Sequence, residues 1–261
     1  MKNSTLNKVE KEKNIKEKDN YPFFYTTAGA LLLIAVWKLI SLGYNPVILP
    51  SPEQTLMTLY EMILSKSFYI TLSYSLFRVI SAYFLAFIIG TITGIAMGLN
   101  KNIDNFLRPL VSMLQTIPNI SWILLAIIWF GLNSKIVIFT VTISIVPIFI
   151  INSAEGIYNT DKEFLEMAAV YRLNPLTIFR KIYLYSIKPY LRSAAVITGE
   201  RAWKIGAMAE LLSLETGIGA GLYWARNNLQ TERIFAWTIV LVMLGFLSSK
   251  MLKVIFADKK P

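Results

Sequence analysis

Residues 136–151 read IVIFTVTISIVPIFII and contain no charged side chain. A helix at the surface of a soluble protein keeps a polar face, and this stretch has none. Residues 29–37 (GALLLIAVW) and 123–131 (ILLAIIWFG) are apolar on all sides in the same way. Helices of this kind are stable in lipid, where their side chains meet hydrocarbon instead of water. The sequence therefore predicts an all-α membrane protein.

The composition of the 261-residue chain excludes several kinds of chemistry. Hydrophobic residues make up 55% of the chain and charged residues 16%, whereas a soluble domain carries about 25% charged residues. There is no cysteine and no histidine, which excludes disulfides, thiol catalysis and the commonest zinc sites. The phosphate-binding pattern G-x-x-x-x-G-K-[ST] is also absent, as is any nucleophile–base set. We expect no enzyme activity, no metal and no cofactor in this chain.

The apolar stretches and the basic residues together predict a topology. Six stretches could cross a bilayer: 23–43, 75–98, 107–131, 134–155, 189–212 and 233–254. An even number of spans places both ends on one side. Most Lys and Arg residues outside the spans fall in the two terminal segments, the 99–108 loop and the 156–192 region, which the positive-inside rule makes cytoplasmic. The net charge of +10 is thus typical of membrane loops and gives no reason to expect nucleic acid as a partner.

The domain organisation follows from the same pattern. Residues 1–20, which are rich in lysine, are expected to form a disordered basic cytoplasmic tail close to membrane lipid. Residues 21–261 are expected to form one transmembrane domain with its core at 68–254. The expected location is a bacterial plasma membrane, with several passes and with both termini in the cytoplasm.

Between the fourth and fifth stretches lies a polar, interrupted segment, KEFLEMAAVYRLNPLTIFRKIYLYSIKP, residues 162–189. Thr160 and Glu163 have the spacing of a capping box, which predicts that a helix begins there. Helical periodicity gives this helix one apolar face, made of Phe164, Met167, Ala168 and Tyr171. Pro175 ends the helix, and Asn174 is placed to cap a second helix that starts with this proline.

This segment has two interpretations. An amphipathic loop that rests on the membrane surface would explain its composition. A connection between two spans needs only a few residues, however. About thirty residues with a helix start signal and an internal break favour a surface that another protein binds.

The segment and four further motifs resemble a known family. Glu166-x-Ala168-x-x-x-Arg172-Leu173, followed by Phe179 and Pro189, is similar to the conserved cytoplasmic loop of binding-protein-dependent ABC importer permeases. The other motifs are Leu49-Pro50-Ser51-Pro52, Ser75-Leu76-Phe77-Arg78, Pro118-x-x-x-Trp122 through Trp129-Phe130-Gly131, and Ala209-Glu210 with Gly217-Ile218-Gly219. Their order and spacing over roughly 45–255 resemble the nitrate/sulfonate/taurine-type subfamily.

The resemblance implies a transmembrane permease subunit of an ATP-driven importer. Two copies of the permease would form the path for a small solute, a nitrate-, sulfonate- or taurine-like ion or a related organic anion. Two ABC ATPase subunits would bind ATP and Mg, and an extracytoplasmic binding protein would deliver the solute. The 162–189 segment would be the coupling helix that docks on the ATPase. The residues implied in that contact are Phe164, Glu166, Met167, Ala168, Ala169, Tyr171, Arg172, Leu173 and Asn174.

Two positions depart from the loop pattern of the family. Arg172 stands where the family has a glycine, and in a left-handed bend an arginine costs roughly 1–2 kcal/mol. Either the bend is displaced toward Asn174, or Arg172 contacts the ATPase directly. Tyr185 replaces a proline, so the second helix is expected to run straighter into the fifth span.

Charged residues within the fifth span are candidates for the solute path. A charge at the centre of a bilayer costs about 2.5–3.5 kcal/mol, so these residues need partners or water. Glu200 and Lys204 have the i, i+4 spacing of an ion pair. Alternatively, Arg201 and Lys204 line an aqueous path and attract an anion. The candidate path residues are Arg201, Lys204, Glu210, Pro118 and Trp122.

Three other features of the spans predict structural roles. Arg78, early in the second span, is expected to extend toward the membrane surface. Gly90, Gly94 and Gly98 recur every four residues, which predicts close helix packing within the subunit. Pro118 and Pro147 are expected to kink their spans.

Two other classes of protein fit less well. A stand-alone secondary carrier or channel, driven by an ion gradient, would show discontinuous helices in two matched halves, and none are visible. A membrane-embedded enzyme would need candidate catalytic residues, and the sequence offers none.

Overall fold

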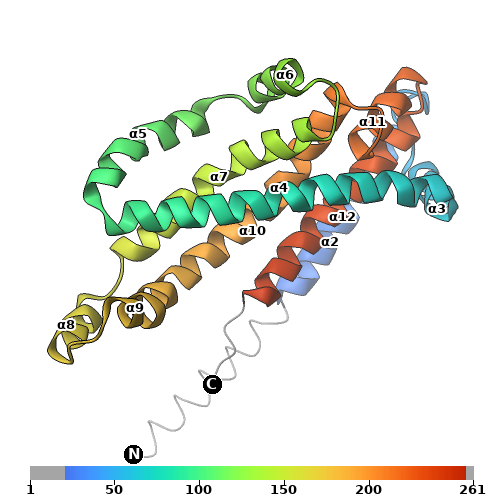
Figure 1. Ribbon diagram of the computed structural model, residues 1–261. Coiled ribbons are helices and arrows are strands. Elements are labelled where there is room, and N and C mark those ends of the chain that lie inside the picture. The colour runs from blue at the N-terminus through green and yellow to red at the C-terminus, as the bar shows by residue number, and fades with distance from the viewer. Residues whose placement is uncertain (1–20, 257–261) are drawn as a thin grey trace, which may run out of the picture.

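The computed structural model describes residues 21–256, so the predicted tail at 1–20 lies outside the described residues. Within this range every regular element is a helix (Figure 1). The long helices are α2 (Tyr21–Ser41), α4 (Lys66–Leu99), α7 (Lys135–Tyr158), α10 (Leu184–Ser213) and α12 (Thr231–Ile255). The shorter ones are α3 (Pro52–Leu64), α5 (Lys101–Thr116), α6 (Asn119–Phe130), α8 (Lys162–Val170), α9 (Pro175–Ile178) and α11 (Ile218–Asn227).

Several of these helices are suited to a membrane. Among the described residues, α4, α7 and α12 are long and apolar enough to cross a bilayer, and the bent pair α5–α6 would make a fourth span. α10 is 30 residues long but carries several charges, and the apolar part of α2 is shorter, Thr27–Ser41. The structure thus confirms a helical protein with several apolar helices, while the count of six spans stays a prediction.

The predicted third span, 107–131, is interrupted at Pro118 more sharply than the expected kink. α5 and α6 meet at an angle of 95°, with Ile117 and Pro118 between them in extended backbone. Proline disfavours helical geometry in the residue before it and cannot donate to the preceding turn. Pro118 therefore occupies the N-cap position of α6 instead of kinking a helix from within. In Figure 1, α5 arches away from α4 and α7, and α6 returns toward them.

The core lies where α4, α7 and α10 pack together. Gly90, Gly94 and Gly98 all face α7, as their spacing predicts. A side chain at Gly90 would bring its Cβ to 2.5 Å from Cβ of Phe149, and one at Gly94 would overlap the carbonyl oxygen of Ile150. Only glycine allows the two backbones to approach this closely, which confirms the packing role.

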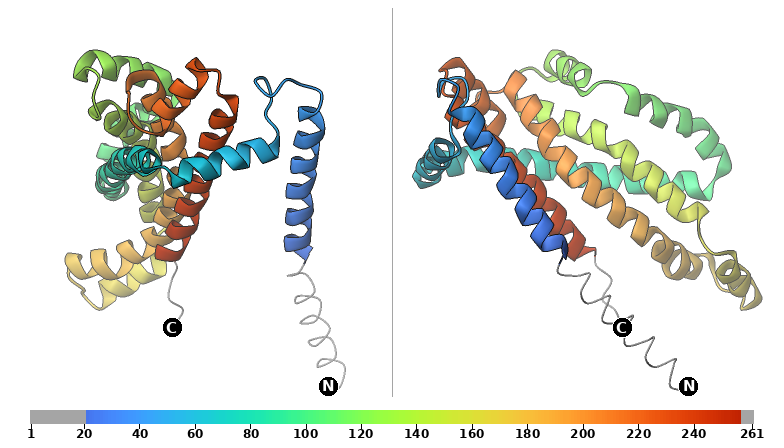
Figure 2. Two further views of the ribbon diagram at one scale, coloured as in Figure 1. Left: turned by 90° about the vertical axis from the view of Figure 1, so that its right-hand side faces the viewer. Right: turned by 180° about the vertical axis from the view of Figure 1, so that it is seen from behind.

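Helix α2 is attached to the rest of the described chain near its C-terminal end. The indole N–H of Trp37 donates to the carbonyl oxygen of Pro50 at 3.0 Å, and its ring stacks on Phe235 of α12 at 5.3 Å. Lys38 pairs with Glu53 of α3 at 2.8 Å. Figure 2 shows the remainder of α2 standing apart from the bundle in one of its two views.

The connecting segments gather at two ends of the molecule. Helices α8 and α9 lie at the end where α2 begins and α12 finishes (Figure 2). Helices α6 and α11 lie at the opposite end. We call residues 162–189 the coupling loop, after the role that the family resemblance implies, and we refer to the two ends as the coupling-loop end and the far end.

Candidate functional site

The coupling loop begins one residue later than the predicted capping box. Asp161 is the N-cap of α8, and its carboxylate accepts from the amide of Glu163 at 3.0 Å. The Thr160 hydroxyl instead donates to the carbonyl oxygen of Gly156 at 3.3 Å, in the last turns of α7. The predicted helix start is therefore correct to within a residue, but Thr160 is not its cap.

Helix α8 ends in a Schellman motif whose left-handed residue is Arg172, with φ of 50°. The amide of Leu173 donates to the carbonyl of Ala168 at 2.9 Å, and the amide of Arg172 donates to that of Ala169 at 3.1 Å. Glycine is the usual residue at this position because it has no Cβ to meet the backbone. The bend thus sits at Arg172, and the alternative of a bend displaced toward Asn174 is wrong.

Asn174 caps the second helix of the loop, as predicted. Its side-chain oxygen accepts from the amide of Thr177 at 2.7 Å. From Pro175 the helix runs through α9 and a π-helical turn, η1 (Phe179–Tyr183), directly into α10 without a break. The second helix of the loop is thus continuous with α10 through Tyr185, while its expected straightness stays a prediction.

The apolar face predicted for the loop divides into two parts. Phe164 and Tyr171 project outward, with 52% and 72% of their surface exposed, and Met167 is exposed beside them. Ala168 is only 1% exposed, so it supports the loop and is not available to a partner. The remaining predicted contact residues are all exposed: Glu166, Ala169, Arg172, Leu173 and Asn174.

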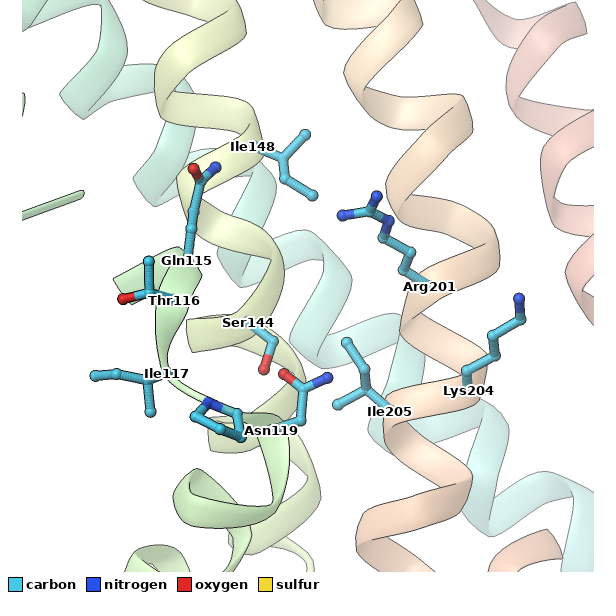
Figure 3. A pocket seen from close by; sticks show the side chains of 10 residues that line it. Gln115, Thr116, Ile117, Asn119, Ser144, Ile148, Arg201, Lys204 and Ile205 are labelled. Carbon is cyan, nitrogen blue, oxygen red and sulfur yellow. The ribbon is translucent and has the colours of Figure 1, made fainter. Parts of the chain in front are cut away.

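A cavity of about 720 Å³ lies where the α5–α6 break faces α7 and α10 (Figure 3). Three elements contribute to its wall. The lining residues are Gln115, Thr116, Ile117, Pro118 and Asn119 from the break, Ser144 and Ile148 from α7, and Arg201, Lys204 and Ile205 from α10. The cavity therefore combines two basic side chains with amide and hydroxyl groups, and none of its lining residues is acidic.

The two basic residues lie differently in this cavity. Figure 3 shows Arg201 directed from α10 toward Ile148, whereas Lys204 points away from the α5–α6 side. Among the described residues no ion pair joins Lys204 to Glu200, so the predicted i, i+4 pair is not formed. Both of these side chains border a second cavity of about 380 Å³ between α10 and α12.

The other candidate path residues are less closely associated with the cavity. Pro118 lines it. Trp122, one turn further along α6, is not in the lining, and its ring meets the edge of Phe139 at 6.2 Å. Glu210 lies elsewhere and is fully buried, so it does not contact this cavity.

Glu210 belongs to a buried polar cluster at the far end, and Arg78 is its partner. The guanidinium of Arg78 lies 2.9 Å from the Glu210 carboxylate and is only 3% exposed. The prediction that Arg78 extends to the membrane surface is therefore wrong. We call Ser75, Arg78, Ser134, Glu210 and Thr216 the far-end cluster, since hydrogen bonds join all five side chains.

No local pattern in the sequence marks this cluster as a unit. The sequence does hold one signal for the cluster, since two predicted spans contain opposite charges. Charges within a membrane usually pair with one another. Arg78 and Glu210 are 132 positions apart, and i, i+4 spacing had already offered Glu200 a nearer partner. This long separation in sequence is the reason that the Arg78–Glu210 pair was not predicted.

Comparison with known proteins identifies the family. A family model described as "Binding-protein-dependent transport system inner membrane component" matches residues 86–259. The chain belongs to this family. It is therefore the transmembrane permease subunit of an ABC importer and not an enzyme, since the ATPase of such importers is a separate subunit.

Individual relatives of this permease point to one subfamily. It is 28% identical over 228 residues to the putative aliphatic sulfonates transport permease SsuC of Bacillus subtilis, covering 86% of this chain and 82% of the relative. It is 30% identical to SsuC of Escherichia coli, covering 83% of each chain. It is 25% identical to the nitrate import permease NrtB of Leptolyngbya laminosa, covering 85% and 82%. The resemblance to the nitrate/sulfonate/taurine subfamily is confirmed.

Solved structures confirm the fold of the permease. An inward-facing structure of the MetNI methionine ABC transporter matches with a TM-score of 0.56 and 17% identity, covering 70% of this chain and 93% of that one. The permease therefore has the fold of ABC importer membrane subunits.

Proposed function

We propose that this permease carries a small anion through the cavity at the α5–α6 break. The main observation in support is the positive charge of the cavity lining. Arg201 faces α7, and no acidic residue lines the cavity to neutralise it. A guanidinium binds planar and tetrahedral oxyanions through several N–H donors at once. Gln115, Asn119 and Ser144 add neutral hydrogen-bonding groups around it.

The relatives support an anionic or zwitterionic solute. The names of SsuC and NrtB specify aliphatic sulfonates and nitrate, and two further relatives are named as the bicarbonate permease CmpB and the taurine permease TauC. Each of these carries a negatively charged oxygen group that an arginine can bind. We therefore propose an oxyanion as the solute class and assign Arg201 the central role, with Lys204 at the margin.

The test is uptake by the complete transporter with Arg201→Gln. Loss of a charge-assisted hydrogen bond costs about 1.5–3 kcal/mol, so uptake should fall roughly 10- to 100-fold. Lys66→Gln, an exposed basic residue at the start of α4 and outside the cavity, is the control and should transport normally. Taurine, ethanesulfonate, nitrate and bicarbonate are the probes. Unchanged uptake by Arg201→Gln of every anion that the wild type transports would refute the proposal.

We propose further that the coupling loop docks on the ATPase through its exposed apolar residues. Phe164 and Tyr171 are large side chains left in contact with solvent by an otherwise capped and ordered loop. Exposed aromatic residues of this kind are frequent at protein interfaces. Tyr171→Asp should therefore reduce co-purification of the ATPase by tenfold or more, because it places a charge in an apolar contact. Tyr44→Asp, at a 55% exposed site in the α2–α3 connection, should have no effect, and equal recovery of the ATPase by both variants would contradict the docking.

We also propose that two copies of the permease assemble and enclose the path. Helix α5 contributes to the cavity wall yet exposes Phe106, Leu110 and Met113, and Figure 1 shows it standing off the bundle. A second copy would cover these residues and close the cavity on that side. The coupling-loop end would face the cytoplasm, because the basic residues outside the spans gather there.

A further inference from the structure

The far-end cluster fixes helix α11 onto α4 and α10. The amide of Gly219 donates to the Glu210 carboxylate at 3.0 Å, and the amide of Ile218 donates to the Ser75 hydroxyl at 2.8 Å. That hydroxyl in turn lies 2.7 Å from the nearer Glu210 oxygen. The first turn of α11 thus directs its free N–H groups at a buried carboxylate, and the helix dipole adds to the attraction.

The connection leading into α11 is held equally closely. Arg78 donates to both the backbone oxygen and the hydroxyl of Thr216, each at 2.7 Å. Gly217 has a φ of 107°, and a side chain at Gly217 would overlap the carboxylate of Glu210. Neither the loop nor the first turn of α11 can shift without breaking several directional hydrogen bonds in a buried site, where unpaired polar groups are costly.

Helix α10 connects this cluster to the coupling loop by a continuous helix, whose two irregular points are the π-helical turn η1 and Pro189. The helical path from Pro175 through η1 to Ser213 is unbroken, and the 30 residues of α10 alone extend about 45 Å. Glycines keep the neighbouring helices in close contact along the way. A Cβ at Gly206 would lie 2.7 Å from Val79 of α4, and one at Gly156 of α7 would lie 2.9 Å from Cα of Ile187.

The wall formed by α5 and α6 is attached in a different way. Helix α6 buries Ile123 and Ala126 in the core, and its N-terminus has no side-chain cap. Within the described residues, no side-chain hydrogen bond or ion pair ties α6 to α7 or α10. Helix α5 contacts the end of α7 through the half-exposed Arg108, which lies 3.9 Å from Glu155 and 5.8 Å from the centre of the Tyr158 ring. Apolar contacts between helices permit small sliding movements, whereas a buried hydrogen-bonded ion pair has one geometry.

We propose that the far-end cluster makes α11 part of one rigid body with the coupling loop. When the ATPase displaces the coupling loop, α4, α7 and α10 transmit the displacement to α11. The wall formed by α5 and α6 moves against this rigid body and so opens or closes the cavity. Arg78 and Glu210 are the positioning residues of this device. Helix α11 presents Tyr223, Trp224 and Arg226 at the far end, so it is the element that reports the movement to the extracytoplasmic binding protein. The inference rests on the proposed docking of the coupling loop.

The first experiment removes the cluster charges together, as Arg78→Met with Glu210→Gln, since a lone buried charge would destabilise the protein. The complete transporter is assayed in lipid nanodiscs with purified binding protein and a mixture of taurine, ethanesulfonate, nitrate and bicarbonate. We expect basal ATP hydrolysis and melting temperature near wild type, and a loss of at least fivefold in stimulation by the binding protein. Lys38→Met with Glu53→Gln removes an exposed pair between α2 and α3 and serves as the control. Full stimulation in the cluster variant would overturn the inference.

The second experiment leaves the cluster intact and so does not depend on the stability of a variant. Spin labels on Asn227→Cys of α11 and Ser193→Cys of α10 report whether the two helices move together. We expect their separation to change by less than about 2 Å between nucleotide-free and ATP-bound transporter, within the range of ordinary helix shifts. A larger change would refute the rigid body. Because this distance involves neither Arg201 nor the solute, its outcome is independent of the proposed anion path.

Discussion

At the scale of single residues, two side chains occupy positions that glycine normally holds. Arg172 ends α8 with φ of 50°, and Leu229 ends α11 with φ of 54°. Around Leu229 the hydrogen bonds are those of a Schellman motif, since the amide of Gln230 donates to Ala225 at 2.9 Å. A left-handed residue with a Cβ costs roughly 1–2 kcal/mol. Neither bend needs its side chain for packing, so packing does not offset this cost.

Replacing either residue by glycine should stabilise the permease. Glycine removes the left-handed cost but gains entropy in the unfolded chain, so the expected net gain is about 0.5–1 kcal/mol. The melting temperature in detergent should rise for Arg172→Gly and for Leu229→Gly. The alanine variants retain a Cβ and should show no such rise. A lower melting temperature for both glycine variants would contradict the strain argument.

The same pair of variants separates the two possible roles of Arg172. If its side chain contacts the ATPase, Arg172→Gly lowers ATPase recovery in spite of its gain in stability. Leu229→Gly, at the far end, leaves recovery unchanged in either case.

The single residues also show where sequence reasoning fails. Asn174 was correctly predicted as a cap because its partner lies three residues away. Arg78 was expected to extend toward the membrane surface, and its partner was missed because Glu210 comes near it only after α4 and α10 have packed. Local signals identify local bonds, whereas a buried ion pair between distant helices depends on the complete fold.

At the scale of elements, the same contrast explains the break between α5 and α6. Hydropathy runs on through 107–131 and therefore predicted a single span with a kink at Pro118, where the structure has a 95° break. Hydropathy indicates whether a segment is surrounded by lipid or by water. It carries no information on the direction of the helix axis. The direction changes at Ile117, whose extended backbone follows from the proline after it.

The packing of α4 on α7 gives a prediction at this scale. Gly94→Leu would force a side chain into the carbonyl oxygen of Ile150 and the side chain of Ser153. Overpacking of this kind costs typically 1–3 kcal/mol, so the melting temperature should fall and less folded protein should be recovered. Gly29→Leu on α2 meets nothing within 4 Å and should be tolerated. Equal melting temperatures for the two variants would show that α4 and α7 are not in close contact.

At the scale of the whole molecule, the sequence correctly predicted an all-helical protein with several apolar helices, because long apolar runs are a local pattern. The six spans, and the coupling loop between the fourth and the fifth, stay predictions. Pro118, Arg201 and Lys204 were predicted as path residues and do line the cavity, whereas its other lining residues come from separate elements and were not predicted. Side chains brought together by folding leave no common pattern in the sequence.

The orientation of the molecule is open to a direct test, because the chain has no native cysteine. Lys101→Cys lies at the turn between α4 and α5, and Asn227→Cys lies at the end of α11. A membrane-impermeant thiol reagent should label Asn227→Cys in intact cells and Lys101→Cys only in inside-out vesicles. The reverse pattern would place the coupling loop outside the cell and overturn the orientation inferred from loop charges.

The far-end cluster also limits how this sequence can diverge. A descendant that loses Arg78 alone keeps a buried carboxylate with its cationic partner missing, and one that loses Glu210 alone strands a guanidinium. Either intermediate is strongly destabilised, whereas an apolar pair of similar volume is not. The two positions are therefore expected to change together or not at all across lineages, and a chain that carries only one of them should show a compensating change at Ser75 or Thr216.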